Sequence, residues 1–460
     1  MPEQLTLNLE GTPEAPSEEP VVLRFDEGTL VADGLGRDDP GSGGFEFDDR
    51  IDRYRAEAFA YRRLLGRLLK VGWTVVDEAR AYGDVDLEIV DRFEPYEHQS
   101  GALQAWLGAE KRGTVVLPTG SGKTYVAQLA MEEVARSTLV VVPTIDLMNQ
   151  WSGVLEESFG CEVGLLGGGY HEVEDVSVAT YDSAAMHMER IGNEFGLLVF
   201  DEAHHLPSEF YRQAAEFCIA PFRLGLTATP ERADGKEDDL ADLVGPIVYR
   251  KSIKELSGDV LANYEIETIQ VGMTPEDKER YDEARAFYRS FVSDEGIRMG
   301  ASNGWVRFLA ATNRSERGRR ALRAYQIQKQ LALVNSAKME RLFDLLETHR
   351  DDPLLIFTND NESVYEISER ALVPSITHQT KVKERKEILS RFNEGVYGTI
   401  VTSKVLNEGV DVPRARIGVV MSGSGSVREH VQRLGRILRR WEGRGAVLYE
   451  LVTDDTVETH

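Results

Sequence analysis

The sequence is poor in cysteine, in long apolar runs and in net positive charge. Its 460 residues include only two cysteines, Cys161 and Cys218, too few for a disulfide framework or a cysteine-based metal centre. We expect both to be buried thiols. No apolar run approaches the ~18 residues of a membrane-spanning helix, and residues 1–20 lack the apolar core of a signal peptide. These absences predict a cytoplasmic protein that does not enter a membrane.

Acidic residues strongly outnumber basic ones. The chain carries 78 Asp and Glu against 53 Lys and Arg, for a net charge of −25. Such a charge usually disfavours nucleic-acid binding. At molar salt, however, the Debye length is only about 3 Å, so diffuse acidic charge costs little repulsion. The composition therefore predicts a halophile, in which contacts with a nucleic acid are short-range because counterion release contributes little.

The chain is long enough for about three domains. Residues 1–20 are rich in proline and glutamate and are expected to form a disordered acidic tail. Residues 21–90 are expected to form a small α+β domain. Its elements would be a hairpin over 21–31, a helix over 51–70 and strands over 73–76 and 85–90.

From about Phe93 onward, short apolar strands alternate with helical patterns. This alternation predicts an α/β fold with two parallel-sheet lobes, residues 91–250 and 251–460. A helical segment without a strand pattern, about 274–336, interrupts the second lobe. The expected strands are 114–117, 139–142, 177–179, 197–200 and 223–227 in the first lobe, and 354–357, 375–377, 399–402, 417–421 and 446–451 in the second.

A glycine-rich stretch, LPTGSGKT at 117–124, lies between an expected strand and an expected helix. Backbone N–H groups around Gly120, Ser121 and Gly122 can face phosphates, and the following helix dipole adds positive potential. Lys123 would reach the γ-phosphate of ATP, and the Thr124 hydroxyl would hold Mg²⁺. A chance glycine turn is the alternative, but the strand–turn–helix context favours a nucleotide site.

A second motif supplies the carboxylates that nucleotide hydrolysis requires. The apolar strand 197–200 leads directly into Asp201 and Glu202, followed by Ala203 and His204. Asp201 would hold Mg²⁺ through water, and Glu202 would orient and deprotonate the attacking water. An acidic helix cap is the simpler alternative, but the phosphate loop upstream favours hydrolysis. Gln99 could read adenine through its amide.

The second lobe offers positive charge for the same chemistry. Gln432, Arg436 and Arg439 share one face of an expected helix. Guanidinium groups aimed across a cleft would act as arginine fingers on the developing phosphate charge. Gly409 and Asp411 would supply a backbone turn and a carboxylate for the ribose or for an arginine finger. A solvated basic helix is the alternative for this face.

Taken in order, these motifs resemble those of superfamily 2 helicases, and more closely the XPB family of DNA helicases in its shorter archaeal form. The resemblance covers roughly residues 21–451. It implies two RecA-like lobes with ATP between them, a damage-recognition-like domain at 21–90 and a thumb-like insert at 274–336. It also implies 3′-to-5′ movement, a role in nucleotide excision repair or transcription, and, with the acidic composition, a halophilic archaeon.

DNA contacts are expected in two places. Residues 305–329 carry seven basic residues and one acidic residue, and Trp305 and Phe308 stand beside them for base stacking. Pairing of these arginines with the acidic surface is the alternative. Within the lobes, hydroxyls and turn N–H groups would bind phosphates without reading sequence. The expected contact residues are Pro143, Thr144, Gln150, Thr180, Tyr181, Arg232, Asp234, Arg317, Arg320, Arg323, Thr402 and Ser403.

Two other functions stay open. The family carries an Arg-Glu-Asp triplet where this chain has Arg232, Ala233 and Asp234. Loss of the central carboxylate favours a duplex-DNA translocase, or an ATP-gated scaffold for a partner nuclease, that unwinds little. An RNA helicase is the third hypothesis, since the Asp-Glu-Ala-His box also occurs there. In each case we expect a monomer that depends on ATP and Mg²⁺.

Overall fold

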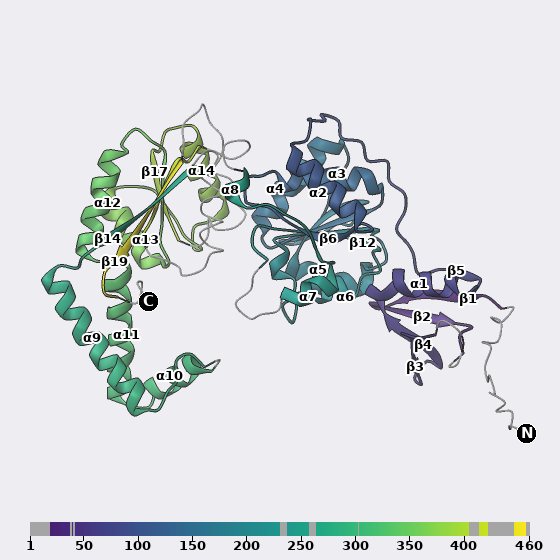
Figure 1. The fold of residues 1–460 in the computed structure, drawn as a ribbon, viewed down its shortest axis with the longest axis horizontal. Helices are drawn as coiled ribbons and strands as arrows, with labels where there is room; N and C mark the ends of the chain where they lie inside the picture. The colour runs from purple at the N-terminus through teal and green to yellow at the C-terminus, as the bar shows by residue number, and fades with distance from the viewer. Residues whose placement is uncertain are drawn as a thin grey trace, which may run out of the picture. The chain divides into compact units, whose positions relative to one another are not determined.

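The chain forms two compact units, Met1–Ser252 and Ile253–His460, in the computed structural model (Figure 1). The structure describes residues 19–36, 39, 42–230, 237–256, 264–301, 303–403, 414–421 and 446–456. Among these residues, no helix is both long and apolar enough to cross a bilayer.

The first unit begins with a five-stranded sheet in the order β3-β4-β2-β1-β5. The strands are β1 (Val21–Asp26), β2 (Thr29–Asp33), β3 (Glu46–Asp48), β4 (Arg53–Glu57) and β5 (Val75–Asp77). The hairpin expected over 21–31 is confirmed as β1 and β2. The helix expected over 51–70 is wrong in its first part, because residues 53–57 pair with both β2 and β3. Only η1 (Ala58–Ala60) and α1 (Tyr61–Lys70) are helical there.

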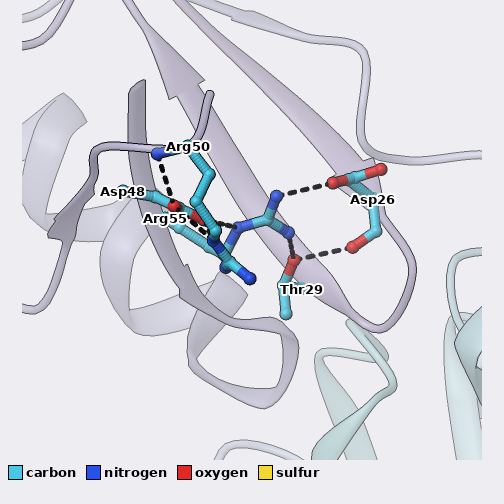
Figure 2. A network of polar contacts seen from close by, with 5 residues as sticks. All are labelled: Asp26, Thr29, Asp48, Arg50 and Arg55. Carbon is cyan, nitrogen blue, oxygen red and sulfur yellow. Dashed lines mark hydrogen bonds and ion pairs between the residues drawn. The ribbon is translucent and has the colours of Figure 1, made fainter. Parts of the chain in front are cut away.

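A polar network holds β3 and β4 to the β1–β2 turn (Figure 2). Arg55 donates through Nε to Asp48 at 3.0 Å, through one terminal nitrogen to Asp26 at 2.8 Å and through the other to the Thr29 hydroxyl. Arg50 donates to both carboxylate oxygens of Asp48, at 2.8 and 2.7 Å. These donors, with Arg50 first, hold the pKa of Asp48 well below its usual range.

The stretch 85–90, expected as a strand, forms none. Asp84, the residue before this stretch, forms an isolated β-bridge with Arg136. The amides of the stretch bond instead to other groups: Ile89 donates to a Glu132 carboxylate oxygen at 3.2 Å and Val90 to the Ser158 carbonyl at 2.8 Å. Leu87 and Ile89 are buried and Val90 is exposed, so the apolar pattern reflects packing on the surface of the first lobe.

The first lobe is an eight-stranded sheet in the order β13-β6-β12-β11-β7-β10-β8-β9, parallel except for the β8–β9 pair. Its strands are β6 (Arg112–Val116), β7 (Thr138–Val142), β8 (Gly164–Gly167), β9 (Tyr170–His171), β10 (Val176–Thr180), β11 (Leu197–Asp201), β12 (Phe222–Thr227) and β13 (Ile247–Arg250). The helices are α2 (Glu97–Gly108), α3 (Lys123–Val134), α4 (Ile145–Phe159), α5 (Tyr181–Ile191), η2 (Ala203–His205), α6 (Gln213–Glu216) and α7 (Glu237–Leu243). Figure 1 shows α2 and α3 on one face of the sheet and α5, α6 and α7 on the other.

The second unit holds a six-stranded parallel sheet in the order β14-β19-β18-β15-β17-β16. Its strands are β14 (Tyr264–Val271), β15 (Leu354–Phe357), β16 (Ser375–Ile376), β17 (Thr399–Thr402), β18 (Ile417–Val420) and β19 (Ala446–Thr453). The described helices are α8 (Ile253–Leu256), α9 (Pro275–Asp294), α10 (Gly304–Thr312), α11 (Glu316–Leu333), α12 (Ser336–Thr348), α13 (Asn361–Ala371) and α14 (Val382–Asn393). The α/β class with two parallel sheets is confirmed.

Helices α9, α10 and α11 pack together into what we call the three-helix segment, in which α9 and α11 lie side by side (Figure 1). Its apolar core includes Phe291, Phe308 and Ala321. Phe308 is fully buried and touches Trp305, Tyr288 and other rings. Base stacking by Phe308 is therefore wrong, because the core of the segment uses its ring.

Candidate functional site

The glycine-rich loop lies between β6 and α3 and is shaped by two left-handed glycines. Gly120 has φ of 83° and Gly122 has φ of 81°, a conformation that side chains disfavour. A Cβ at Gly122 would also lie 2.3 Å from the Gln99 amide nitrogen. The loop thus needs glycine for its backbone, and a side chain at Gly122 would displace the Gln99 amide.

Lys123 begins α3 and is held by the loop itself. Its ammonium donates to the carbonyls of Leu117 at 3.1 Å and Pro118 at 3.3 Å. The Thr119 hydroxyl is buried there and has no hydrogen-bond partner among the described residues. Thr124 follows in the first turn of α3. A lysine on neutral carbonyls and an unsatisfied hydroxyl at a helix N-terminus fit an anionic ligand such as a phosphate group.

Two side chains of helix α2 contact the carbonyls of this loop. His98 Nε2 lies 2.8 Å from the Ser121 carbonyl, and the Gln99 amide nitrogen lies 3.2 Å from it and 3.4 Å from the Gly122 carbonyl. The amide oxygen of Gln99 accepts from the Tyr96 N–H at 2.9 Å. The Gln99 amide thus already bonds within the protein, although a carboxamide has two N–H groups and two lone pairs and can form further bonds. Adenine recognition by Gln99 stays a prediction. The role of His98 was not predicted.

Asp201 ends β11 and is almost completely buried, with 8% of the residue exposed. Its two carboxylate oxygens accept from the Trp151 indole N–H and from the Glu202 backbone N–H, both at 2.9 Å. The Tyr181 hydroxyl donates to the Asp201 carbonyl at 3.0 Å. These bonds fix the carboxylate at the edge of the sheet, and the supporting role of Trp151 was missed from the sequence.

Glu202 starts a buried polar chain that ends after β12. It adopts φ of 46°, which is uncommon for a residue with a side chain. His204 Nδ1 lies 3.5 Å from a Glu202 carboxylate oxygen and 3.1 Å from the Thr227 hydroxyl. The same hydroxyl accepts from the Thr229 N–H at 3.2 Å. His204 therefore lies between the Thr227 hydroxyl and the Glu202 carboxylate.

Three strands bring these groups to one edge. β12 lies between β6 and β11, and all three run parallel, so their carboxyl ends point the same way. Val116 pairs with Thr227, and Leu226 pairs with Asp201. The phosphate loop, the threonine turn and the two carboxylates therefore leave the sheet at the same edge, where parallel sheets bind ligands.

Two helix N-termini lie beside this edge, at the ends of β7 and β10. Thr144, next to Pro143, caps α4 by accepting from the Leu147 N–H at 3.2 Å. Thr180 caps α5 in the same way through the Ser183 N–H at 3.3 Å. The Tyr181 side chain is 1% exposed and supports Asp201. DNA binding here stays a prediction, and it would use the helix ends rather than the Tyr181 ring.

Gln150 is exposed on α4. In the second unit, Thr402 and Ser403 at the end of β17 are buried, and the Thr402 hydroxyl donates to the Ser403 carbonyl at 3.0 Å. Other predicted residues lie outside the described parts of the chain: Arg232, Asp234, Gly409, Asp411, Gln432, Arg436 and Arg439. Their assignments stay predictions.

The three arginines of α11 that were expected to contact DNA differ in environment. Arg317 forms an ion pair with Asp294 of α9. Arg320 stacks on Phe287, with 4.9 Å between its guanidinium carbon and the ring centre. Arg323 is exposed and, with Arg280 and Arg320, lines an open cavity of about 490 Å³. Acidic pairing therefore holds for Arg317, whereas Arg320 and Arg323 line a cavity with three arginines and one acidic residue, Glu283. DNA contact by Arg320 and Arg323 stays a prediction.

Family models match three stretches of the chain. They are "Type III restriction enzyme, res subunit" at residues 92–232, "Helicase conserved C-terminal domain" at 337–440 and "Xeroderma pigmentosum group B helicase damage recognition domain" at 23–79. The solved Hef helicase domain of Pyrococcus furiosus is similar in fold, with a TM-score of 0.52 at 19% identity, over 79% of this chain and 96% of that one. The class is therefore a RecA-like helicase.

Relatives narrow this class. The "DNA 3'-5' translocase XPB2" of Sulfurisphaera tokodaii is 40% identical over 443 residues, which cover 95% of this chain and 98% of the relative. The "DNA 3'-5' helicase XPB" of Mycobacterium tuberculosis is 29% identical over 430 residues, or 89% of this chain and 70% of the relative. The chain belongs to the XPB family of superfamily 2 helicases.

Replacing Trp151 by phenylalanine tests the anchoring of Asp201. An aromatic ring of smaller volume is kept, but the indole donor to the carboxylate is lost. Because a hydrogen bond to a charged group contributes about 1.5–3 kcal/mol, we expect ATP hydrolysis to fall roughly tenfold or more. Steady-state kinetics at several Mg²⁺ concentrations measure this.

Trp106→Phe is the matched control. Trp106 is also fully buried, but its indole N–H donates to the Arg223 carbonyl at 2.9 Å, away from the carboxylates. It should lower the melting temperature while the hydrolysis rate of the folded protein is retained. Equal rates for Trp151→Phe and the wild type would contradict the role given to Trp151.

Proposed function

We propose that this protein is an ATP-dependent DNA helicase or translocase that moves 3′ to 5′ and acts in nucleotide excision repair or transcription. The observation that carries the ATPase is the buried polar chain from Glu202 through His204 to Thr227, at the sheet edge that also bears the phosphate loop. The names of the relatives support DNA as the track and give the direction.

The nucleotide chemistry follows from the residues at that edge. Lys123 and the loop N–H groups would bind the phosphates, and Thr124 and Asp201 would hold Mg²⁺. When bound, Mg²⁺ would neutralise phosphate charge. The backbone N–H of Glu202 donates to the Asp201 carboxylate. The Glu202 side chain would orient the attacking water and take its proton.

The second lobe would complete the site, as the family resemblance implies. Gln432, Arg436 and Arg439 would stabilise the charge that develops on the phosphates. Gly409 and Asp411 would contact the ribose or position an arginine. We propose residues 21–90 as the damage-recognition-like domain, 91–250 as the ATP-binding lobe and 251–460 as the second lobe, with an insert at about 274–336.

Sequence-independent DNA binding is proposed at the helix ends of the first lobe and on the three-helix segment. The capped N-termini of α4 and α5 offer N–H groups and positive dipole ends to a phosphate backbone. Arg320 and Arg323 add charge, and Trp305, 42% exposed, offers a ring for stacking. We propose that the protein works as a monomer at high salt.

ATP hydrolysis in molar KCl tests the function. We expect stimulation by duplex and single-stranded DNA and none by RNA. Lys123→Ala should abolish hydrolysis and retain DNA binding, because the phosphate contact is lost and the DNA contacts lie elsewhere. Stimulation by RNA alone would contradict the proposal and favour an RNA helicase.

Charge reversal of Arg320 and Arg323 tests the DNA surface. Arg320→Glu with Arg323→Glu should weaken DNA affinity at least several-fold in a fluorescence binding titration at working salt, because attraction becomes repulsion at short range. Arg317→Ala is the control and should change affinity less, because Asp294 already neutralises Arg317. Unchanged affinity in the double variant would remove this surface from the account.

A translocase that unwinds little, or a scaffold for a partner nuclease, is the second candidate. Ala233 favours it, because a carboxylate expected in strand separation is missing. Strand displacement, measured beside triplex displacement with and without a nuclease, separates the two. Triplex displacement without strand separation would select the translocase.

A further inference from the structure

A buried lysine joins the three-helix segment to the sheet of the second lobe. Lys338 lies in the first turn of α12 and is 0% exposed. Its ammonium donates to three backbone carbonyls: Ala332 at 3.2 Å, Leu333 at 3.4 Å and Met421 at 2.9 Å. One charged group thus bonds to two elements that lie far apart in the sequence.

The first of these elements is the end of α11. Ala332 and Leu333 stand in its last turn, where carbonyls have no partner within the helix and carry the negative end of the helix dipole. A cation at that end is favourable. Lys338 therefore bonds to the C-terminal end of α11, whereas Arg320 and Arg323 lie nearer to the N-terminal end of that helix.

The second element is β18. Met421 follows its last residue, Val420, and β18 lies between β15 and β19 in the sheet. Beyond Met421 the chain continues toward Gln432, Arg436 and Arg439, which are proposed to act on the phosphates. Lys338 thus holds the strand end from which that segment departs.

Neighbouring polar groups stiffen the same junction. The Thr453 hydroxyl of β19 donates to the Ala332 carbonyl at 2.7 Å. The Asn335 amide donates to the Leu331 carbonyl at 3.1 Å and to the Thr453 hydroxyl at 3.0 Å. A shift of α11 would thus break several buried hydrogen bonds unless β18 and β19 moved with it.

We propose that Lys338 is a positioning residue that couples DNA contact on α11 to ATP hydrolysis. This inference rests on the proposed function. Loss of either set of carbonyls would leave a buried ammonium short of partners, which is costly. Movement of Arg320 and Arg323 on DNA is therefore passed to Met421, at the end of β18.

The test is the ratio of ATP turnover at saturating duplex DNA to turnover without DNA. Lys338→Met keeps the length of the side chain and removes the ammonium. We expect the ratio to fall roughly tenfold, within the range of coupling between two sites. A purely structural role would lower the melting temperature and leave the ratio at its wild-type value, which would overturn the inference.

Leu342→Ala is the matched control. Leu342 lies one turn further along α12, is 0% exposed and packs in the core of the same lobe, without a polar bond to α11 or β18. It should lower the melting temperature and keep the ratio near the wild-type value. An equal fall of the ratio in both variants would overturn the inference.

Amide hydrogen exchange on the wild-type protein tests the coupling even if Lys338→Met does not fold. Duplex DNA alone should slow amide exchange in the first turn of α12 and in β18. Unchanged exchange there, with DNA bound, would overturn the coupling. Absence of DNA stimulation in the wild type would instead refute the proposed function, so the two failures are distinguishable.

Discussion

The candidate nucleotide site depends on one constraint, the parallel alignment of β6, β12 and β11. Because the three strands end at the same edge, a glycine loop, a threonine turn and two carboxylates meet there. Burial of a charged carboxylate at that edge costs free energy, and hydrogen bonds to its oxygens must offset this cost. Trp151 and the Glu202 N–H supply them to Asp201, and each bond to such a charge contributes about 1.5–3 kcal/mol.

Each unit also contains a fully buried cation that binds backbone carbonyls. In the first unit Arg223 donates to the carbonyls of Ala215, Cys218 and Leu243, at 3.0, 2.8 and 2.6 Å. Burial lowers its pKa to about 9, so the guanidinium is still charged at neutral pH. In the second unit Lys338, on α12, donates to the carbonyls of Ala332, Leu333 and Met421. Both cations therefore connect segments that lie apart in the sequence.

Local patterns predicted much of the fold. Strands such as 354–357 and 399–402 have the predicted bounds, because short apolar runs between turns are typical of buried parallel strands. The predictions were wrong where tertiary pairing overrides local periodicity, as in β4, or where an extended segment packs without pairing, as at 85–90. Cys161 was expected to be buried but is only half-buried. β14 was missed, although it pairs with β19 over eight residues.

The sequence also located the motifs at 117–124 and 201–204, because phosphate and metal chemistry restricts residue types and spacing. The structure brings both motifs to one sheet edge, and their chemical roles stay predictions. The residues that support these motifs were not identifiable, since His98 and Trp151 act through contacts that the sequence does not encode locally. The same holds for Phe308 and Arg317, whose partners come from α9.

The most direct test of the account is the Mg²⁺ dependence of nucleotide affinity. A fluorescent ATP analogue would be titrated into the wild type and into Asp201→Asn, which keeps the size of the side chain and removes its charge. The account predicts that Mg²⁺ tightens binding to the wild type and has little effect on the variant. Equal tightening in both proteins would show that Asp201 is not the carboxylate that holds the metal, and would contradict the central claim.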